Sequence, residues 1–389
     1  MKIRVAIDVI PIRTDGRVGG LMPATNALIQ EFCKRSEEVD IVLLTAEWNH
    51  AYFTEMVGSE RVLQVVGEEA SPSSSLLRRA WEKCKRWLAG PPETFRTMKA
   101  DVMYCPMSAI SLFREDLPVI CQINDIQHEY YPQFFTPEEN SHRTSFYKNV
   151  CEKATALVAI SQYTKDTFCE KYAFPAERMQ VIHLSVQERL LRLTEAQKEA
   201  VLEPLGLSGK RYFYYPANFW PHKNHDVLLV AFNMLVKQGS DAHLVLTGSL
   251  ADARQTLGDA VRQMGLTERV HFLGYVSDEQ LAAIFQQCHA LVFPSLFEGF
   301  GIPLVEAMSF GKPIVCSSST CLPEVAQEAA LYFDPRKPAE LCAAMRQLEE
   351  KPDLYAALQE KGRLRLAAFN QEKMVNLYMD VFRKWGNKQ

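Results

Sequence analysis

The sequence lacks several features that mark specialised classes of protein. Its ten cysteines are scattered over 389 residues without a C-x-x-C pair or an obvious metal-binding spacing. In a chain of this size they indicate reduced thiols in a cytosolic protein. Lys and Arg (43) nearly balance Asp and Glu (47), and the net charge is −4. This balance argues against a protein that binds nucleic acid along its whole length.

Long apolar runs are also missing. The longest, residues 227–232, is far shorter than the ~20 residues that span a bilayer. Residues 1–10 resemble a signal peptide only superficially, because Asp8 interrupts the apolar run and no small-residue cleavage site follows. We therefore expect a cytoplasmic protein with at most peripheral membrane contact.

The composition that remains is that of an ordinary globular protein. Hydrophobic residues make up 47% of the chain and charged residues 23%. These values exclude a disordered, collagen-like or low-complexity chain. At roughly 100–200 residues per domain, the length favours two domains.

Short β-rich runs alternate with longer helical stretches in the first half of the chain. The expected strands are residues 3–9, 41–45, 102–104, 119–123, 156–160 and 180–184. The expected helices are residues 23–35, 76–88 and 141–153. Strands that alternate with helices favour βα units and a mostly parallel sheet.

The pattern stops at residues 186–210, which are charged and contain Pro204, Gly206 and Gly209, so we interpret them as a linker. The alternation then restarts. The expected strands are residues 212–216, 243–247, 270–273, 290–293, 313–316 and 330–333. The expected helices are residues 225–238, 250–264, 278–287, 303–309, 338–348 and 354–384.

The sequence therefore predicts an α/β protein with two tandem Rossmann-like domains, residues 1–185 and 211–365, that face each other across a cleft. Residues 366–389 are expected to form a C-terminal helix that packs back on the first domain. Ligands of such sheets bind outside the carboxyl ends of the strands, so the cleft is the expected site.

The most informative segment is residues 293–308. A strand is expected to end near Phe293, and a loop with Gly299 and Gly301 follows. Pro303 is suited to the first position of a helix. Glycines let the backbone approach a ligand closely, and the helix N-terminus offers free N–H groups and a partial positive charge. The segment therefore predicts an anion site suited to a diphosphate.

Two carboxylates, Glu298 and Glu306, lie beside this predicted anion site. Since they would repel phosphate, we interpret them as acceptors of hydrogen bonds from the neutral hydroxyls of a ribose and a sugar. The alternative is that Glu306 complements the helix dipole and that Glu298 is a solvated loop residue.

The stretch from Glu298 to Met308 resembles the signature of family 4 glycosyltransferases. Further resemblances lie at residues 19–20, 160–164, 270–281, 311–315 and 322–325. The resemblance implies a GT-B fold and a retaining enzyme that needs no metal ion or other cofactor. It would move a hexosyl unit from a nucleotide-diphosphate sugar to a saccharide or lipid-linked acceptor in polysaccharide biosynthesis.

The same resemblance assigns roles to residues of this chain. The first domain would hold the acceptor, and the second the nucleotide sugar. The residues assigned to donor binding are Gly19, Gly20, Asn218, His222, Lys223, Gly248, Glu298, Gly299, Phe300, Gly301, Ile302, Pro303, Leu304 and Glu306. Those assigned to catalysis are Glu298, Lys223, His128, Asn124 and Asp125. Lys223 would stabilise the departing diphosphate, with Glu298 on the donor sugar and Glu306 on the ribose.

Two positions depart from the family pattern. Asn218 stands where the family usually has an Arg, five residues before Lys223, and removes bidentate recognition of phosphate. Asn124 stands where a His usually precedes Asp125. His222 and His128 are the candidates to compensate, although a lone His such as His128 is as often structural.

These departures leave a second function open, namely a weakened homologue that acts as a scaffold or partner subunit. Nucleotide-sugar epimerases and phosphorylases of the same architecture are disfavoured. Epimerase relatives lack the two spaced glutamates in this setting, and phosphorylases are much longer and need a pyridoxal-binding Lys.

Residues 76–88 are a separate signal, because five basic side chains accompany an apolar stripe at helical spacing. A basic amphipathic helix can lie on an anionic membrane, which suits a lipid-linked acceptor. The alternative is a helix that packs its apolar stripe on the first sheet, which is the commoner case.

Overall fold

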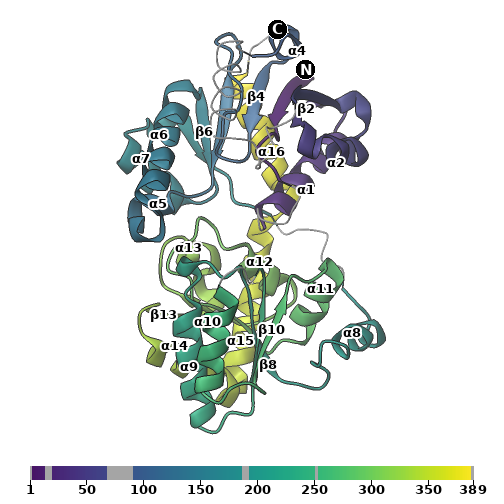
Figure 1. Cartoon of the computed structure of the whole chain (residues 1–389). Coiled ribbons are helices and arrows are strands. Elements are labelled where there is room, and N and C mark those ends of the chain that lie inside the picture. The colour runs from purple at the N-terminus through teal and green to yellow at the C-terminus, as the bar shows by residue number, and fades with distance from the viewer. Residues whose placement is uncertain (1, 14–19, 68–90, 186–191, 250–252, 387–389) are drawn as a thin grey trace.

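The computed structural model describes residues 2–13, 20–67, 91–185, 192–249 and 253–386, and the side chains of 253–255 are left out. The chain forms two α/β lobes, one above the other in Figure 1. The expected helix at 76–88 and Gly19 lie outside the described residues.

The first lobe is built on a parallel sheet. Its described strands are β1 (Ile3–Asp8), β2 (Val39–Ala46), β3 (Val62–Val66), β4 (Val102–Cys105), β5 (Val119–Ile123), β6 (Ala156–Ala159) and β7 (Met179–Val181). Their spatial order is β3-β2-β1-β4-β5-β6-β7. Its helices are α1 (Leu21–Lys34), α2 (Glu47–Val57), α4 (Glu93–Thr97), α5 (Gln127–Tyr130), α6 (Pro137–Lys153) and α7 (Gln162–Tyr172).

The second lobe repeats this plan. Its described strands are β8 (Tyr212–Pro216), β9 (His243–Thr247), β10 (Val270–Gly274), β11 (Ala290–Phe293), β12 (Ile314–Ser317) and β13 (Ala330–Phe333), in the parallel order β10-β9-β8-β11-β12-β13. Its helices are α8 (Glu195–Leu202), α9 (His225–Lys237), α10 (Ala253–Gln263), α11 (Asp278–Gln287), α12 (Ile302–Ser309), α13 (Leu322–Ala326), α14 (Pro338–Glu350) and α15 (Pro352–Leu366).

The predicted fold class is confirmed, because both sheets are parallel and helices connect their strands. In each sheet the strand order reverses once, between β1 and β4 and between β8 and β11. Loops on either side of such a reversal diverge and leave a crevice at the carboxyl ends of the strands. The two crevices position the candidate site.

Side chains alternate between the two faces of the first sheet, as the pleat requires. Val5 and Ile7 of β1 pack in one apolar cluster and Ala6 in another. The first cluster is completed by α1 and by α16 (Gln371–Trp385), the second by α6 and α7. Figure 1 shows α16 leaving the lower lobe and running up beside α1.

The C-terminal region differs from the single helix expected at 354–384. The helix α15 ends at Leu366, a 3-10 turn (Ala367–Phe369) follows, and the Asn370 side chain accepts a hydrogen bond from the Lys373 N–H at 2.9 Å to begin α16. An Asn at an N-cap satisfies an orphan donor, so the chain can change direction there. This break lets α15 stay with the second lobe while α16 packs on the first.

The stretch interpreted as a linker is partly structured. Thr194 caps α8 with a reciprocal capping box, and Leu202 and Leu207 are buried in the core of the second lobe. The Leu193 backbone is also bonded in both directions to the Gln286 side chain. The stretch from Leu193 to Leu207 therefore packs as part of the second lobe.

Five described elements of the first lobe were missed: the short helices α4 and α5, and α2, β3 and α7. The helices α2 and α7 carry weak helical amphipathicity, because polar residues interrupt their buried faces. Strand β3 lies at the sheet edge and buries mainly Val65. Tertiary packing therefore fixes these elements more than local pattern does.

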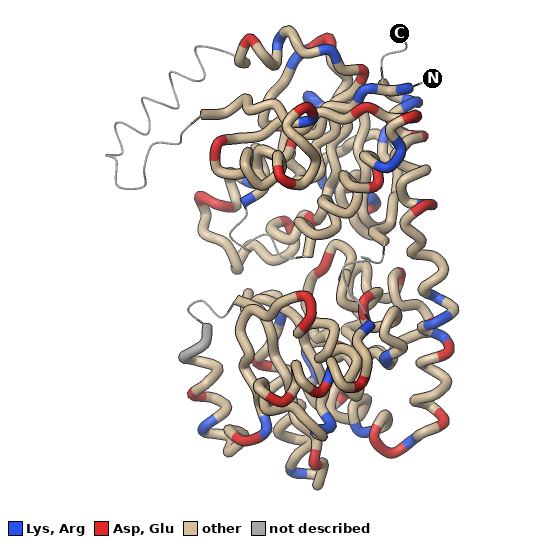
Figure 2. The backbone as a smooth tube through the Cα atoms, turned by 90° about the vertical axis from the view of Figure 1, so that its right-hand side faces the viewer, with Lys and Arg blue, Asp and Glu red and all other residues tan. Residues whose placement is uncertain are grey.

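Lys and Arg alternate with Asp and Glu over both lobes in Figure 2, without one broad face of a single sign among the residues drawn in colour. None of the helices within the described ranges is long and apolar enough to cross a membrane.

Candidate functional site

A cavity of about 1530 Å³ lies between the two lobes, at the carboxyl ends of both sheets. The second lobe lines it with residues 216–218 and 220–223 after β8 and with residues 297–303 and 306 after β11. The first lobe contributes the start of α1 and the loop that contains Asn124, Asp125 and Gln127. The structure thus brings most of the predicted site residues to one cavity.

The segment between β11 and α12, residues 294–301, is called the signature loop below. It ends at Gly301, which has φ +88° and caps α12. A side chain there would be strained and would also press on Leu322. Pro303 occupies the first turn of α12, where a missing N–H costs nothing. The N-terminus of α12 is therefore aimed at the cavity, as its lining residues Ile302 and Pro303 show.

Glu298 and Lys223 form an ion pair inside the cavity. The Lys223 Nζ lies 2.6 Å from the Glu298 Oε1, and their side chains are only 15% and 12% exposed. The Tyr215 hydroxyl donates to the Lys223 carbonyl at 2.9 Å, which fixes the backbone of the lysine. Each charge is thus held in place by the other, and a bound anion would compete with Glu298 for the ammonium group.

The backbone of Glu298 is held from the loop before α13. Its N–H donates to the Thr320 hydroxyl at 3.2 Å, and the Cys321 thiol donates to its carbonyl at 3.2 Å. Thr320 has φ +57°, a conformation that a non-glycine residue rarely adopts. Sequence analysis missed both supporting residues, because neither carries a motif of its own.

Glu306 lies in the first half of α12 and lines the cavity, although the residue is only 4% exposed. Its backbone carbonyl accepts from the Ser309 hydroxyl at 2.7 Å. Leu304, in contrast, is fully buried in the core of the second lobe and does not line the cavity. Its side chain therefore has a packing role, and its assignment to donor binding stays a prediction.

The segment after β8 carries the position where the family has an Arg. The Asn218 Oδ1 accepts from the Ser249 N–H at 2.8 Å, so this side chain joins two cavity loops instead of supplying a charge. The Gly248 backbone lines the same corner. Burial lowers the pKa of His222 to about 2, with Lys223 and His225 adding to the effect. A neutral imidazole cannot replace the positive charge of the missing Arg.

The first lobe lines the cavity with the loop after β5 and with acidic and basic side chains, namely Glu31, Lys34, Glu139 and Arg143. The Asn124 side chain donates to the Pro106 carbonyl at 3.2 Å and to the Ser108 hydroxyl at 3.1 Å, and it accepts from the Gln122 amide at 2.7 Å. The Asp125 carboxylate accepts from the Gln127 N–H at 3.0 Å and shapes the turn into α5. Both residues line the cavity, as expected.

His128 does not line the cavity. Its ring is 3% exposed, stacks on Tyr147 with centroids 5.5 Å apart, and lies 3.1 Å from the Tyr172 hydroxyl. Burial lowers its pKa, an effect opposed mainly by Glu129. The helical turn of α5 points residue 128 away from the cleft, so His128 takes the structural role that was its alternative.

Gly20 lines the cavity at the start of α1, and a side chain there would press on Ile302 of the second lobe. The two lobes also touch along the signature loop. A Cβ on Gly299 would overlap the backbone carbonyl oxygen of Asn124, so only glycine allows this approach. Phe297, 3% exposed, is surrounded by Tyr130, Tyr131 and Tyr163 of the first lobe.

Comparison with known families agrees with this geometry. Residues 18–188 match the model described as glycosyltransferase family 4, and residues 197–365 match glycosyl transferases group 1. The two models follow each other along the chain, one on each lobe. The chain belongs to the family 4 glycosyltransferases.

Individual relatives of this family 4 chain carry related names. It is 31% identical over 185 residues to O-antigen chain mannosyltransferase B of Escherichia coli, a match that spans 47% of the chain and about half (49%) of that relative. It is 25% identical over 323 residues to the O-antigen chain mannosyltransferase RfbU of Salmonella typhimurium, which covers 82% of the chain and 84% of RfbU.

Solved structures share the fold of this family 4 chain. HepE of Anabaena, crystallised with UDP and glucose, has a TM-score of 0.75 at 17% identity and covers 98% of this chain and 100% of its own. WaaG, a glycosyltransferase involved in lipopolysaccharide biosynthesis, has a TM-score of 0.72 at 15% identity, over 97% of this chain and 99% of WaaG. At these identities the likeness concerns the two-domain architecture.

Proposed function

We propose that this chain transfers a hexosyl unit from a nucleotide-diphosphate sugar to a saccharide or lipid-linked acceptor, with retention of anomeric configuration and without a metal ion. The observation that carries the proposal is the half-buried Lys223–Glu298 pair, which faces the cavity beside the N-terminus of α12. Family membership supports the same reaction class.

Negative charge builds on the diphosphate as its bond to the sugar breaks. Lys223 and the backbone at the start of α12 are placed to stabilise that charge, because both are fixed before the donor arrives. The cationic side chain and the helix dipole act together at one side of the cavity. This part of the machinery belongs to the second lobe.

The two glutamates have separate tasks in this proposal. Once the diphosphate binds Lys223, the Glu298 carboxylate is released to accept hydrogen bonds from hydroxyls of the donor sugar. Glu306 lies one helical turn into α12, where it would accept from the ribose. Neutral hydroxyls are suitable partners, because phosphate would be repelled by both carboxylates.

Retention follows in this proposal if the acceptor attacks from the side on which the diphosphate leaves. The bond from the anomeric carbon to the diphosphate oxygen breaks, and a bond to the acceptor oxygen forms on the same face. The acceptor proton passes to the departing diphosphate. Closure of the two lobes would exclude water that hydrolyses the donor.

The names of relatives favour polysaccharide assembly. The E. coli and Salmonella relatives are described as O-antigen chain mannosyltransferases. HepE is described with UDP and glucose. Among the hexosyl donors, we therefore propose a nucleotide-linked mannose or glucose.

The experiment is a donor panel of UDP-, GDP-, ADP- and dTDP-linked hexoses with lipid-linked and free saccharide acceptors. We expect acceptor-dependent release of nucleoside diphosphate from one donor, and a product whose new linkage keeps the anomeric configuration by NMR. Chelation should leave the rate unchanged. An inverted linkage or a rate lost on chelation would overturn that part of the proposal.

A second candidate, a weakened homologue that acts as a scaffold or partner subunit, rests on Asn218 and the neutral His222. Asn218 lies where the family usually places an Arg, and His222, the candidate to compensate, is held neutral because burial lowers its pKa. This alternative predicts that nucleoside diphosphates raise the melting temperature, while no donor of the panel is turned over.

A further inference from the structure

The first turn of α7 borders the second lobe. The first N–H groups of a helix have no partner within the helix. In α7 the Thr164 N–H donates to the Ser161 hydroxyl, and the Lys165 N–H makes the first intrahelical bond, to the Ser161 carbonyl. The N–H groups of Gln162 and Tyr163 donate to a carboxylate of the other lobe.

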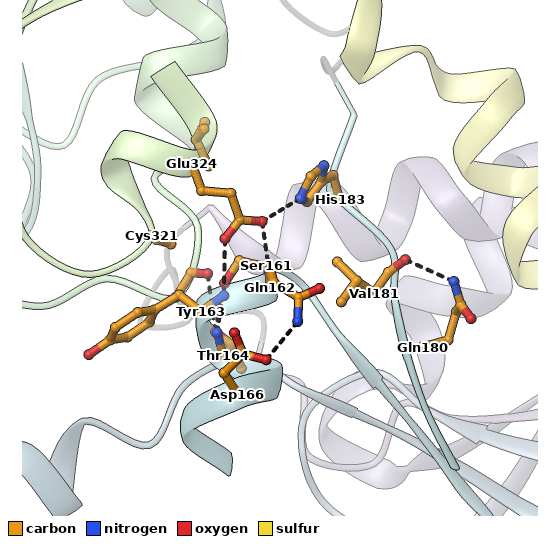
Figure 3. A network of polar contacts seen from close by, with 12 residues as sticks. Ser161, Gln162, Tyr163, Thr164, Asp166, Gln180, Val181, His183, Cys321 and Glu324 are labelled. Atoms are coloured by element: carbon orange, nitrogen blue, oxygen red, sulfur yellow. Dashed lines mark hydrogen bonds and ion pairs between the residues drawn. The ribbon is translucent and has the colours of Figure 1, made fainter. Parts of the chain in front are cut away.

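That carboxylate is Glu324 of α13. Its Oε1 accepts from the Gln162 N–H at 2.7 Å, and its Oε2 accepts from the Tyr163 N–H at 3.0 Å. His183, on the segment that follows β7, places its Nε2 2.7 Å from the same Oε1. Figure 3 shows these contacts converging on Glu324 from the two segments of the first lobe. One side chain therefore joins α13 to α7 and to the chain that crosses between the lobes.

The segment before α13 also forms hydrogen bonds with the signature loop. Thr320 and Cys321, directly before α13, hold the Glu298 backbone from both sides. On the other side of the cleft, the Thr164 hydroxyl of α7 donates to the Gly299 carbonyl at 3.3 Å. The same two helices that Glu324 joins therefore contact the signature loop at neighbouring residues.

We propose that Glu324 is a positioning residue for glycosyl transfer, which holds α13 against α7 and so fixes the closed cleft in which the signature loop meets Asn124. This inference rests on the proposed function for its kinetic consequence. Its structural consequence, a wider cleft when the carboxylate is lost, is independent of any substrate. Glu324 itself does not line the cavity, which separates it from the residues placed on the donor.

The test compares Glu324→Ala, Glu324→Gln and Glu328→Ala. Glu328 is a matched control, because it lies four residues on, is 88% exposed and pairs with Lys361 of its own lobe. The Gln variant keeps an oxygen for the two bonds at Oε1 but turns an amide NH2 group, a donor, toward the Tyr163 N–H. Small-angle scattering, hydrogen exchange at Gln162 and Tyr163, and turnover with varied acceptor are measured on the full chain.

We expect Glu324→Ala to enlarge the radius of gyration, to lose protection at both amides, and to lower kcat by about 10–100-fold, since small misplacements across a cleft are costly. The KM for the donor should change far less, because Lys223, Glu298 and α12 stay together in one lobe. Glu324→Gln should recover part of the loss and should protect the Gln162 amide more than the Tyr163 amide, and Glu328→Ala should match wild type.

The inference is overturned if Glu324→Ala and Glu328→Ala give the same scattering and the same protection. It is also overturned if turnover falls while the cleft keeps its width, since Glu324 would then act on substrate directly. An inactive wild type would refute the proposed function instead, and the scattering and exchange comparison would still decide the role of Glu324.

Discussion

The two walls of the cleft are built from the same fold but differ in what they present. The second lobe offers a half-buried ion pair, a helix N-terminus and a glycine-rich loop. The first lobe offers Asn124 and Asp125, whose polar atoms are mostly engaged with neighbouring residues of the same lobe. The groups proposed to hold the donor diphosphate therefore lie on the wall of the second lobe, called the charged wall below.

The largest expected effect tests the charged wall. Lys223→Ala removes the cation next to the departing diphosphate, and turnover should fall about 10²–10³-fold, the usual loss for one such donor. Glu298 is left without its partner, so the melting temperature should also fall. Steady-state kinetics and thermal melts measure the two effects.

Lys237→Ala, an exposed residue at the end of α9, serves as the control for charge alone. If Lys223→Ala turned over donor as fast as this control, the charged wall would have no catalytic part, and the contrast between the walls would disappear.

The next effect tests the place where the walls meet. Gly299→Ala puts a methyl group onto the Asn124 carbonyl, so the lobes must separate or the signature loop must shift. We expect kcat/KM to fall about 10–100-fold, because a displacement of about 1 Å is enough to cost that much.

Gly258→Ala in α10 is the matched control, since its nearest neighbour is the Arg262 Nη1 at 3.7 Å and a helical alanine is favourable. A Gly299→Ala variant with wild-type kinetics and scattering would show that the walls do not need to touch.

A third effect concerns His225, a buried residue at the start of α9 that does not line the cavity. Burial, with a smaller effect from Lys223, lowers the pKa of His225 to about 3. The unfolded chain therefore binds a proton below about pH 6.5 that the folded chain does not, and stability falls as the pH drops through that value. Between pH 6.5 and 5 the loss should approach about 2 kcal/mol.

The measurement is urea unfolding of wild type and His225→Phe at pH 7.5, 6 and 5. The Phe variant can keep the stacking on Phe219 and should lack this part of the pH dependence. Parallel curves for the two proteins would mean that His225 is charged when folded.

The smallest effect is expected in the first lobe. His128→Phe keeps the stacking on Tyr147 and loses the contact with the Tyr172 hydroxyl, which still donates to Glu129 at 2.6 Å. Turnover should stay at the wild-type value in direct comparison with Asn124→Ala, which changes a residue of the cavity. A clear loss in His128→Phe would return His128 to the catalytic residues.

The sequence predicted much of the fold because buried strands carry a strong local signal. The bounds of β5, β8, β9, β11 and β13 were predicted to the residue, as were those of α11. Edge strand β3 and helix α8 were missed, since both depend on what they pack against. The local sequence pattern also could not predict the direction of the His128 side chain, because that direction depends on where the short helix α5 begins.

The sequence by itself determined the alternation of strands and helices, the glycine-rich turn into α12 and the two glutamates in it. These follow from short-range rules for periodicity, helix termini and backbone freedom. Only the tertiary structure decided that Lys223 meets Glu298, that Gly299 reaches Asn124 and that Glu324 caps α7. The partners in these contacts are 75 residues apart for Lys223 and Glu298 and 162 for Glu324 and Gln162. Contacts at such separations arise from how two sheets are placed against each other, which no local pattern records.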